Sequence, residues 1–177
     1  MRDVLDELMS IWRSGGTAGL ATVVRTVRSA PRSPGAAMVV APDGSVFGSV
    51  SGGCVEAAVY ELATEVVRTG RPALQRYGIS SDDAFEVGLT CGGEIDIFAE
   101  PVSQEVFPQL QTVADAIAAH RPIAVATVIA HPDPRWLGRR LVIEPGDVAG
   151  SMGSARADAA VTDDARGLLS AGRSAVL

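Results

Sequence analysis

Residues 38–70, MVVAPDGSVFGSVSGGCVEAAVYELATEVVRTG, hold the pattern that decides the fold. Two apolar runs, 36–41 and 45–50, flank a Pro-Asp-Gly turn at 42–44, and this arrangement predicts a β-hairpin. Apolar residues then recur every three or four positions, which predicts a helix over 53–69. The stretch therefore predicts a unit made of a hairpin followed by a helix.

The segments on either side add more helices and strands. Helical spacing of apolar residues indicates the helices, and β-branched or alternating runs indicate the strands. We expect helices over 3–13, 106–117 and 156–171, and strands over 18–27, 73–80, 94–99, 122–130 and 139–144. Hairpins mixed with helices predict an α/β (α+β) fold with a mixed β-sheet and flanking helices.

The same unit recurs faintly later in the chain. LATVV at 20–24 returns as VATVI at 125–129, and MVVAPDGSVFGS at 38–49 parallels LVIEPGDVAGS at 141–151. We expect a single domain over 1–177 that contains an internal duplication, with two pseudo-repeat halves of about 1–103 and 104–177. Gly153-Ser154-Ala155-Arg156 in the second half replaces Ser51-Gly52-Gly53-Cys54, so the second half lacks the thiol.

Composition excludes several classes of protein. The formal charge is −6, and all 15 basic residues are arginines, which argues against broad binding to nucleic acids or anionic membranes. The absence of lysine excludes Schiff-base chemistry. Two cysteines are too few for a disulfide scaffold, and no apolar run is long enough to span a membrane. We expect a soluble cytoplasmic protein with reduced thiols.

The first candidate site is the Ser51-Gly52-Gly53-Cys54 loop between a strand and a helix. Glycines and free N–H groups at a helix start form an anion site suited to phosphate. Cys54 is expected in the first helical turn, where the helix dipole favours a thiolate. Glu56 could bind a ligand, or could simply be a favourable anion at the helix start. The alternative is a tight connection with a small buried cysteine.

The second candidate site, Cys91-Gly92-Gly93, mirrors the first in sequence. We infer that the two loops converge on one site with both thiols at its rim. A structural disulfide is the alternative, which the cytoplasmic prediction weakens. A metal site would need further ligands, and neither His120 nor His131 has ligand-like spacing to a cysteine.

The third candidate is a proline-rich segment with three arginines, Arg25, Arg28 and Arg32. Arginines in a stiff loop after a strand suit the capture of phosphate or carboxylate groups. The alternative is a set of ordinary solvated arginines. Glu94 and Asp96 border these loops and could serve in acid–base work or in binding polar groups.

Three motifs in order resemble one family. TVRSAPRSPGAAMVV (26–40), GSVSGGCVE (48–56) and GLTCGGEIDIFAEPV (88–102) closely resemble the XdhC/CoxI family, the accessory factors of xanthine dehydrogenase and carbon-monoxide dehydrogenase. The resemblance spans the whole chain and is sharpest over 22–102.

The resemblance implies a chaperone and not an enzyme. Such proteins bind the molybdenum cofactor (molybdopterin) as cargo, promote its sulfuration by a cysteine desulfurase and deliver it to a molybdenum hydroxylase apo-enzyme. It also implies a homodimer. Carried over to this chain, the cofactor-binding residues are Ser51, Gly52, Gly53, Cys54, Glu56, Cys91, Gly92, Gly93 and Arg32. Cys54 and Cys91 are the residues it places near molybdenum.

The chain departs from the family in one respect. Members commonly continue into a C-terminal dinucleotide-fold domain, and this sequence carries no glycine-rich dinucleotide fingerprint. Two other functions remain open from the residues alone. One is a thiol-based redox or catalytic protein that uses Cys54 and Cys91, and the other is a non-catalytic interaction protein.

Overall fold

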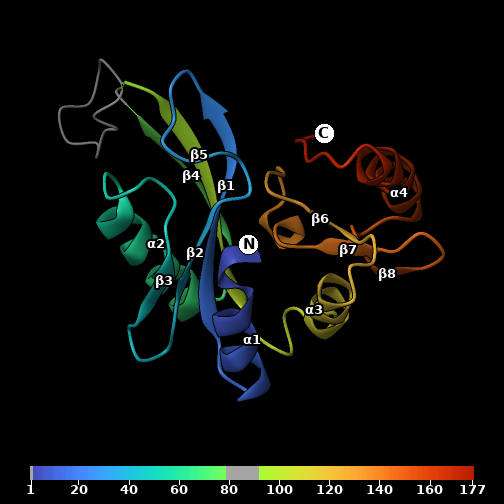
Figure 1. The fold of residues 1–177 in the computed structure, drawn as a ribbon, viewed down its shortest axis with the longest axis horizontal. Coiled ribbons are helices and arrows are strands. Elements are labelled where there is room, and N and C mark those ends of the chain that lie inside the picture. Colours follow the sequence, from blue (N-terminus) through green and yellow to red (C-terminus); the bar gives the residue numbers. More distant parts are fainter. Residues whose placement is uncertain (1, 79–91) are drawn as a thin grey trace. The chain divides into compact units, whose positions relative to one another are not determined.

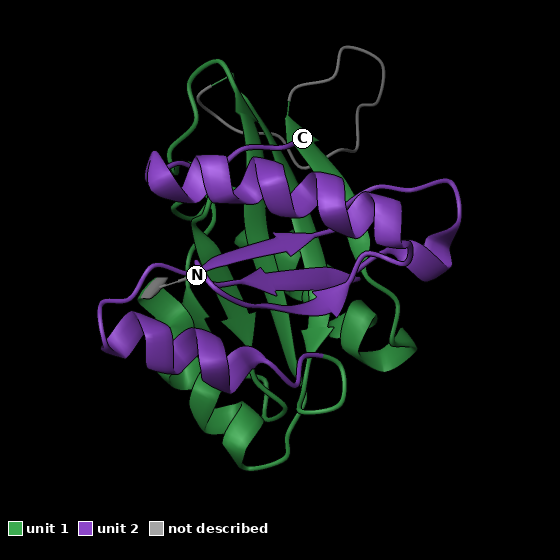
Figure 2. Ribbon diagram, turned by 90° about the vertical axis from the view of Figure 1, so that its right-hand side faces the viewer, with its two compact units in different colours: residues 1–106 green, residues 107–177 purple. Residues whose placement is uncertain are grey.

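The computed structural model describes residues 2–78 and 92–177. The chain divides into two compact units, unit 1 (residues 1–106) and unit 2 (residues 107–177), which are coloured separately in Figure 2. The expected α+β class is confirmed in both, and the strand pairs among the described residues are antiparallel.

Unit 1 is built on a five-stranded sheet in the order β3-β2-β1-β5-β4 (Figure 1). Its elements are a 3₁₀ turn (Arg2–Val4), α1 (Leu5–Arg13), β1 (Ala18–Val27), β2 (Ala37–Val40), β3 (Val46–Gly48), α2 (Glu56–Thr69), β4 (Ala73–Gly78) and β5 (Glu94–Val102). The long β1–β5 pair forms the middle of the sheet, with Val27 opposite Glu94 at one end and Ala18 opposite Val102 at the other.

Helix α2 covers one face of this sheet. Because side chains alternate along a strand, every second residue of β1, β2 and β5 faces this helix. The resulting core contains Ala21, Val23, Met38, Val40, Val59, Ala63, Val66, Ile95, Ile97 and Ala99. Helix α2 packs so closely on the sheet that β1 needs a glycine at position 19, since a Cβ there would lie 2.6 Å from the carbonyl oxygen of Ala63 in α2.

Unit 2 has a three-stranded sheet in the order β6-β7-β8. Its elements are α3 (Leu110–Ala118), β6 (Ala124–Thr127), a 3₁₀ turn (Pro134–Trp136), β7 (Arg140–Ile143), β8 (Val148–Ser151) and α4 (Ala155–Ser170). Leu141, Ile143, Met152 and Ala165 form its core against α4. The order of three strands and a helix is that of β1, β2, β3 and α2, and the internal duplication remains a prediction that this order supports.

Two helices begin later than the sequence predicted. Helix α2 begins at Glu56 and not at residue 53, because Gly52 and Gly53 have φ values of 74° and 115°, outside the helical region. Helix α3 begins at Leu110 and not at residue 106, two residues after Pro108. The last two residues of the strand expected over 73–80 lie outside the described residues. No described helix is long and apolar enough to cross a membrane.

Candidate functional site

The segments that carry the predicted motifs gather at one end of the unit 1 sheet (Figure 1). Strands β1 and β3 end there, and β2, β5 and α2 begin there. The topology therefore brings together loop 28–36, loop 49–55 and the start of β5, although they are distant in sequence.

Glu56 organises the loop that precedes α2. Its Oε1 accepts hydrogen bonds from the Ser49 hydroxyl at 2.7 Å and from the Ser51 amide at 2.9 Å. Its Oε2 accepts hydrogen bonds from the Ser51 hydroxyl and, at 2.8 Å, from the Gly53 amide. The carboxylate thus occupies the place that the sequence suggested for a ligand anion.

These contacts set the charge state of Glu56. Partial burial of the carboxyl raises its pKa, but the hydrogen bonds from Ser51, Ser49 and Gly53 together outweigh that effect and lower the pKa to about 2. Glu56 is therefore ionised throughout the neutral range.

Two further loop amides are also bonded within the loop. The Gly52 amide donates to the Ser49 hydroxyl, and the Val55 amide donates to the Ser51 hydroxyl, both at 3.0 Å. Ser51 itself is buried, whereas Gly52 and Gly53 are exposed, and a Cβ on either glycine would meet nothing within 4 Å among the described residues. The glycines supply left-handed backbone, and their surface is open to solvent.

Cys54 lies two residues before α2, whose N-cap is Val55. The prediction that it sits in the first helical turn is wrong. Gly53 has a non-helical backbone, so the helix begins only at Glu56. Its side chain is half-buried and packs against the core of unit 1, as do Ala30 and Ala36 of loop 28–36. Its sulfur is a thiol and forms no disulfide with another described residue.

The glycine pair before β5, Gly92-Gly93, contacts loop 28–36, the arginine loop, which carries Arg28 and Arg32. A Cβ on Gly93 would lie 1.9 Å from the carbonyl oxygen of Ser29, so only glycine fits there. Gly92 has a φ of 74°. Two of the three motifs are therefore in direct backbone contact. Cys91 lies outside the described residues, so convergence of the two thiols stays a prediction.

Arg25, Arg28 and Arg32 are all exposed. Within residues 2–78 and 92–177, the three side chains have no hydrogen-bond or ion-pair partner, whereas Arg68, Arg76, Arg121 and Arg135 each hold a carboxylate. Arg28 also has a φ of 61°, which is uncommon for a residue with a side chain. This loop presents positive charge that no described carboxylate neutralises, on a protein whose net charge is negative.

Glu94 and Asp96, the two candidate carboxylates on β5, differ in their surroundings. The buried Asp96 accepts two hydrogen bonds from Arg76 of β4, at 2.7 and 3.1 Å. Glu94 begins β5 opposite Val27 and is half-buried. The Asp96–Arg76 pair joins neighbouring strands, which is a structural role.

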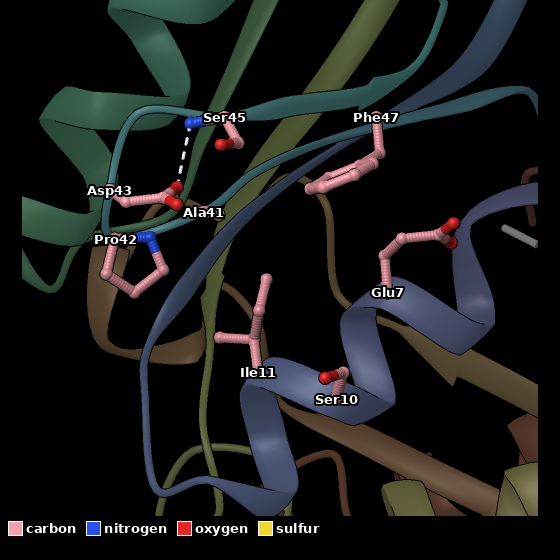
Figure 3. A pocket seen from close by; sticks show the side chains of 8 residues that line it. All are labelled: Glu7, Ser10, Ile11, Ala41, Pro42, Asp43, Ser45 and Phe47. Carbon is pink, nitrogen blue, oxygen red and sulfur yellow. Dashed lines mark hydrogen bonds between the residues drawn. The ribbon is translucent and has the colours of Figure 1, made fainter.

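The hollows in unit 1 lie elsewhere. One of about 350 Å³ lies between α1 and the β2–β3 hairpin, where Ile11 and Phe47 face each other (Figure 3). Another of about 350 Å³ lies beside Tyr60 on the other side of the hairpin. Neither is lined by a predicted site residue. The described part of the chain also holds no group of three or more His, Cys, Asp or Glu side chains that could bind a metal ion.

Sequence reasoning missed Ser49 as a partner of Glu56. A usable signal was present, since serines before a helix and a glutamate in its first turn form reciprocal caps. It also missed that Pro31-Arg32-Ser33-Pro34-Gly35 has a counterpart in Pro134-Arg135-Trp136-Leu137-Gly138.

Comparison with known proteins gives a family match over most of the chain. The sequence model of the XdhC and CoxI family matches residues 11–78 and 116–177. The molybdenum cofactor insertion chaperone PaoD of Escherichia coli is 43% identical over 96 residues, which cover 54% of this chain and 30% of PaoD. A probable xanthine dehydrogenase subunit from Bacillus subtilis is 34% identical over 122 residues, which cover 68% of this chain and 36% of that protein.

A solved structure shares the fold. A crystal structure of a xanthine dehydrogenase from Bacillus halodurans superposes with a TM-score of 0.70 at 24% identity. The match covers 85% of this chain and 45% of that one. The chain spans about a third of the length of the two sequence relatives named above.

Proposed function

The chain belongs to the XdhC and CoxI family, and from this premise we propose that it binds the molybdenum cofactor as cargo and assists its insertion into a molybdenum hydroxylase. The name of the Escherichia coli relative, a cofactor insertion chaperone, supports this role, as does the name of the Bacillus subtilis relative. An accessory protein of this kind retains and hands over its cargo without turning over a metabolite.

The proposed binding site is the end of the unit 1 sheet where the motifs gather. It comprises Ser51, Gly52, Gly53, Cys54, Gly92, Gly93 and Arg32, with Glu56 as the residue that holds the loop in position and Cys91 added from the sequence. The observation that carries this proposal is the contact between Gly93 and Ser29, since it joins the glycine pair after Cys91 to the arginine loop.

The chemistry of these residues suits such a cargo. Molybdopterin carries a phosphate, for which the exposed arginines of loop 28–36 are suitable partners. It also carries a dithiolene-bound metal, beside which a thiol such as Cys54 is a compatible soft group. Exposed Gly52 and Gly53 leave the loop surface open to a planar ligand.

Further steps follow from the same role. We propose that the bound cofactor receives sulfur from a cysteine desulfurase before delivery, and that the recipient is an apo-enzyme of the xanthine dehydrogenase or carbon-monoxide dehydrogenase type. We also propose a cytoplasmic location and a homodimer. The edge strands β3 and β4 expose Val46, Phe47 and Leu74, which a second copy of the chain could cover.

Co-purification tests the role. Protein produced in cells that make the cofactor should carry it, and oxidation should release a fluorescent pterin. Cys54→Ser should retain less, whereas Arg156→Gln, at the position that aligns with Cys54 in unit 2, should retain as much as wild type. Wild-type protein that carries no pterin and binds none of the added cofactor at micromolar concentration would contradict the proposal.

A further inference from the structure

Each unit contains a Pro-Arg-x-x-Gly segment that is held in the same way. In both units the glycine amide donates to the carbonyl of a valine that lies in the preceding strand or directly after it, and that valine's amide donates back to the carbonyl of the residue after the glycine. The bonds are Gly35 to Val23 (2.8 Å) and Val23 to Ala36 (2.9 Å) in unit 1, and Gly138 to Val128 and Val128 to Arg139 (both 2.9 Å) in unit 2. Arg32 and Arg135 therefore occupy matching positions.

The strand-to-helix loops match as well. Gly48 and Gly150 both have positive φ, and a Cβ on either would lie 2.3 Å from a carbonyl oxygen of the neighbouring strand. The Ser151 hydroxyl donates to Asp158 at 2.8 Å, as the Ser49 hydroxyl donates to Glu56. Matching positions in the two units can therefore be compared residue by residue.

This comparison assigns Glu56 to the scaffold. Asp158 in unit 2 also accepts the amide of Met152 at 2.6 Å, although unit 2 has neither the Gly-Gly pair nor the cysteine. A carboxylate that satisfies the loop donors is thus common to both units. The amides of Ser51 and Gly53 are already bonded to Glu56, so they are poor candidates for the donors that hold a ligand anion.

The two arginines differ in their partners. Arg135 is bound by Asp133 through its Nε at 3.0 Å and its Nη2 at 2.7 Å. The residue of unit 1 that matches Asp133 is Ala30, and Arg32 has no ion-pair partner in the described parts of the chain. The positive charge is neutralised by Asp133 in unit 2, whereas no carboxylate among the described residues neutralises it in unit 1.

The surroundings of the two Pro-Arg-x-x-Gly segments also differ, and the segment in unit 2 is again the more closely contacted one. In unit 2, Trp136 and Arg139 lie against Gly153, and His131 stacks on Trp136 with ring centroids 4.6 Å apart. Ser33 and Ala36 replace Trp136 and Arg139 in unit 1. In unit 2, therefore, large side chains cover the loop before the helix. The matching residues of unit 1 are small.

We propose that Arg32, together with Arg28, binds the anionic phosphate of the cargo, and that unit 2 holds a counterpart of this anion site that Asp133 has closed. The identity of the cargo rests on the proposed function. The anion site itself rests on two arginines that pair with no described carboxylate and on the amides that Glu56 occupies. The phosphate then lies at loop 28–36, while loop 49–55 presents Cys54.

A titration with inorganic phosphate at low ionic strength tests this site in the full chain. Backbone amide signals followed by NMR should shift over residues 28–36 in the wild type. Arg32→Gln should weaken the response by about tenfold, since it removes a charged hydrogen-bond donor. Ala30→Asp should weaken it similarly by supplying the carboxylate that unit 2 has. Arg135→Gln, the matched control, should leave it unchanged.

Ala30 packs against the core, so Ala30→Asp could disturb folding. In that case the response of Arg32→Gln alone tests the anion site. Shifts centred on residues 51–55, or an equal response in Arg32→Gln, would overturn the proposal. Cofactor binding measured on the same samples separates the two ideas. Protein that responds to phosphate at 28–36 but binds no cofactor contradicts only the proposed function. Protein that binds cofactor without that response contradicts only the anion site.

Discussion

Glu56 shows how one side chain fixes a loop. It accepts two hydroxyl and two amide hydrogen bonds from three residues, Ser49, Ser51 and Gly53. Four bonds to one carboxylate hold Gly52 and Gly53 in left-handed conformations that would otherwise be entropically costly. The half-buried position of Cys54 follows from that geometry.

Glu56→Gln should lower the free energy of unfolding at pH 7 by about 1–2 kcal/mol, allowing for solvent screening of a partly exposed carboxylate. The folded-state pKa of about 2 lies below the unperturbed 4.5. The associated stability is therefore complete above pH 4.5 and is lost as the pH falls toward 2. Urea unfolding at several pH values should show a shallower acid loss in Glu56→Gln than in wild type. Glu61→Gln, on the exposed side of α2, is the control, and identical acid profiles would refute this role.

Gly93→Ala should destabilise the protein by about 2 kcal/mol or more, because its Cβ would meet the Ser29 carbonyl at 1.9 Å. Gly92→Ala should cost only about 1 kcal/mol, since its φ of 74° is unfavourable but its Cβ meets no described residue within 4 Å. Thermal unfolding of the two variants provides the comparison. Equal losses would mean that the backbone approach between Gly93 and Ser29 is absent in solution.

The position of Cys54 marks the limit of sequence reasoning for single residues. The Gly-Gly pair predicted a turn correctly, but it could not show that both glycines are left-handed or that Glu56 is their partner. Glycine adopts positive and negative φ values about equally readily. The contacts that select one of them form only when the loop folds. Pairing of Asp96 with Arg76 was likewise invisible, since it depends on the register of β4 against β5.

Elements with a strong local pattern were predicted well. The β-branched run at 18–27 gave β1 with both ends correct, and the Pro-Asp-Gly turn gave the β2–β3 hairpin. Strand β5 runs to Val102, beyond the predicted residue 99, because it continues to pair with β1 as far as Ala18. The extension is set by the partner strand and not by the composition of 100–102, which includes a proline.

Gly48→Ala and Gly150→Ala test the equivalence of the β3 and β8 ends. Each would place a Cβ 2.3 Å from a carbonyl oxygen at a positive φ, so each should cost about 2–3 kcal/mol. Hydrogen exchange should show the loss of protection mainly in β2–β3 for Gly48→Ala and mainly in β7–β8 for Gly150→Ala. A tolerated Gly150→Ala beside a damaging Gly48→Ala would argue against the matched architecture.

For the whole molecule, the α+β class could be predicted because hairpins and helices alternate in the sequence. The faint repeat also pointed to a strand, hairpin and helix in each half, and the element order of unit 2 supports it. The functional difference between the two halves of the repeat could not be predicted. The pairing of Arg135 with Asp133 and the packing of Trp136 on Gly153 become visible only once the chain is folded.

The oligomeric state provides a prediction at the same scale. A homodimer should have twice the mass of the 18.3 kDa chain, and it should dissociate on dilution if exposed edge strands make the contact. Sedimentation equilibrium over a range of concentrations measures both. A monomer at every concentration would contradict the dimer and leave the cargo site unaffected.

The affinity of purified protein for the molybdenum cofactor tests the central claim most directly, with two matched double variants. Wild type and the unit 2 variant Arg135→Gln with Arg156→Gln should bind at micromolar concentration or tighter. The unit 1 variant Arg32→Gln with Cys54→Ser should lose at least about tenfold in affinity. Equal affinity in the two double variants, or no binding by wild type, would contradict the claim that unit 1 holds the cargo.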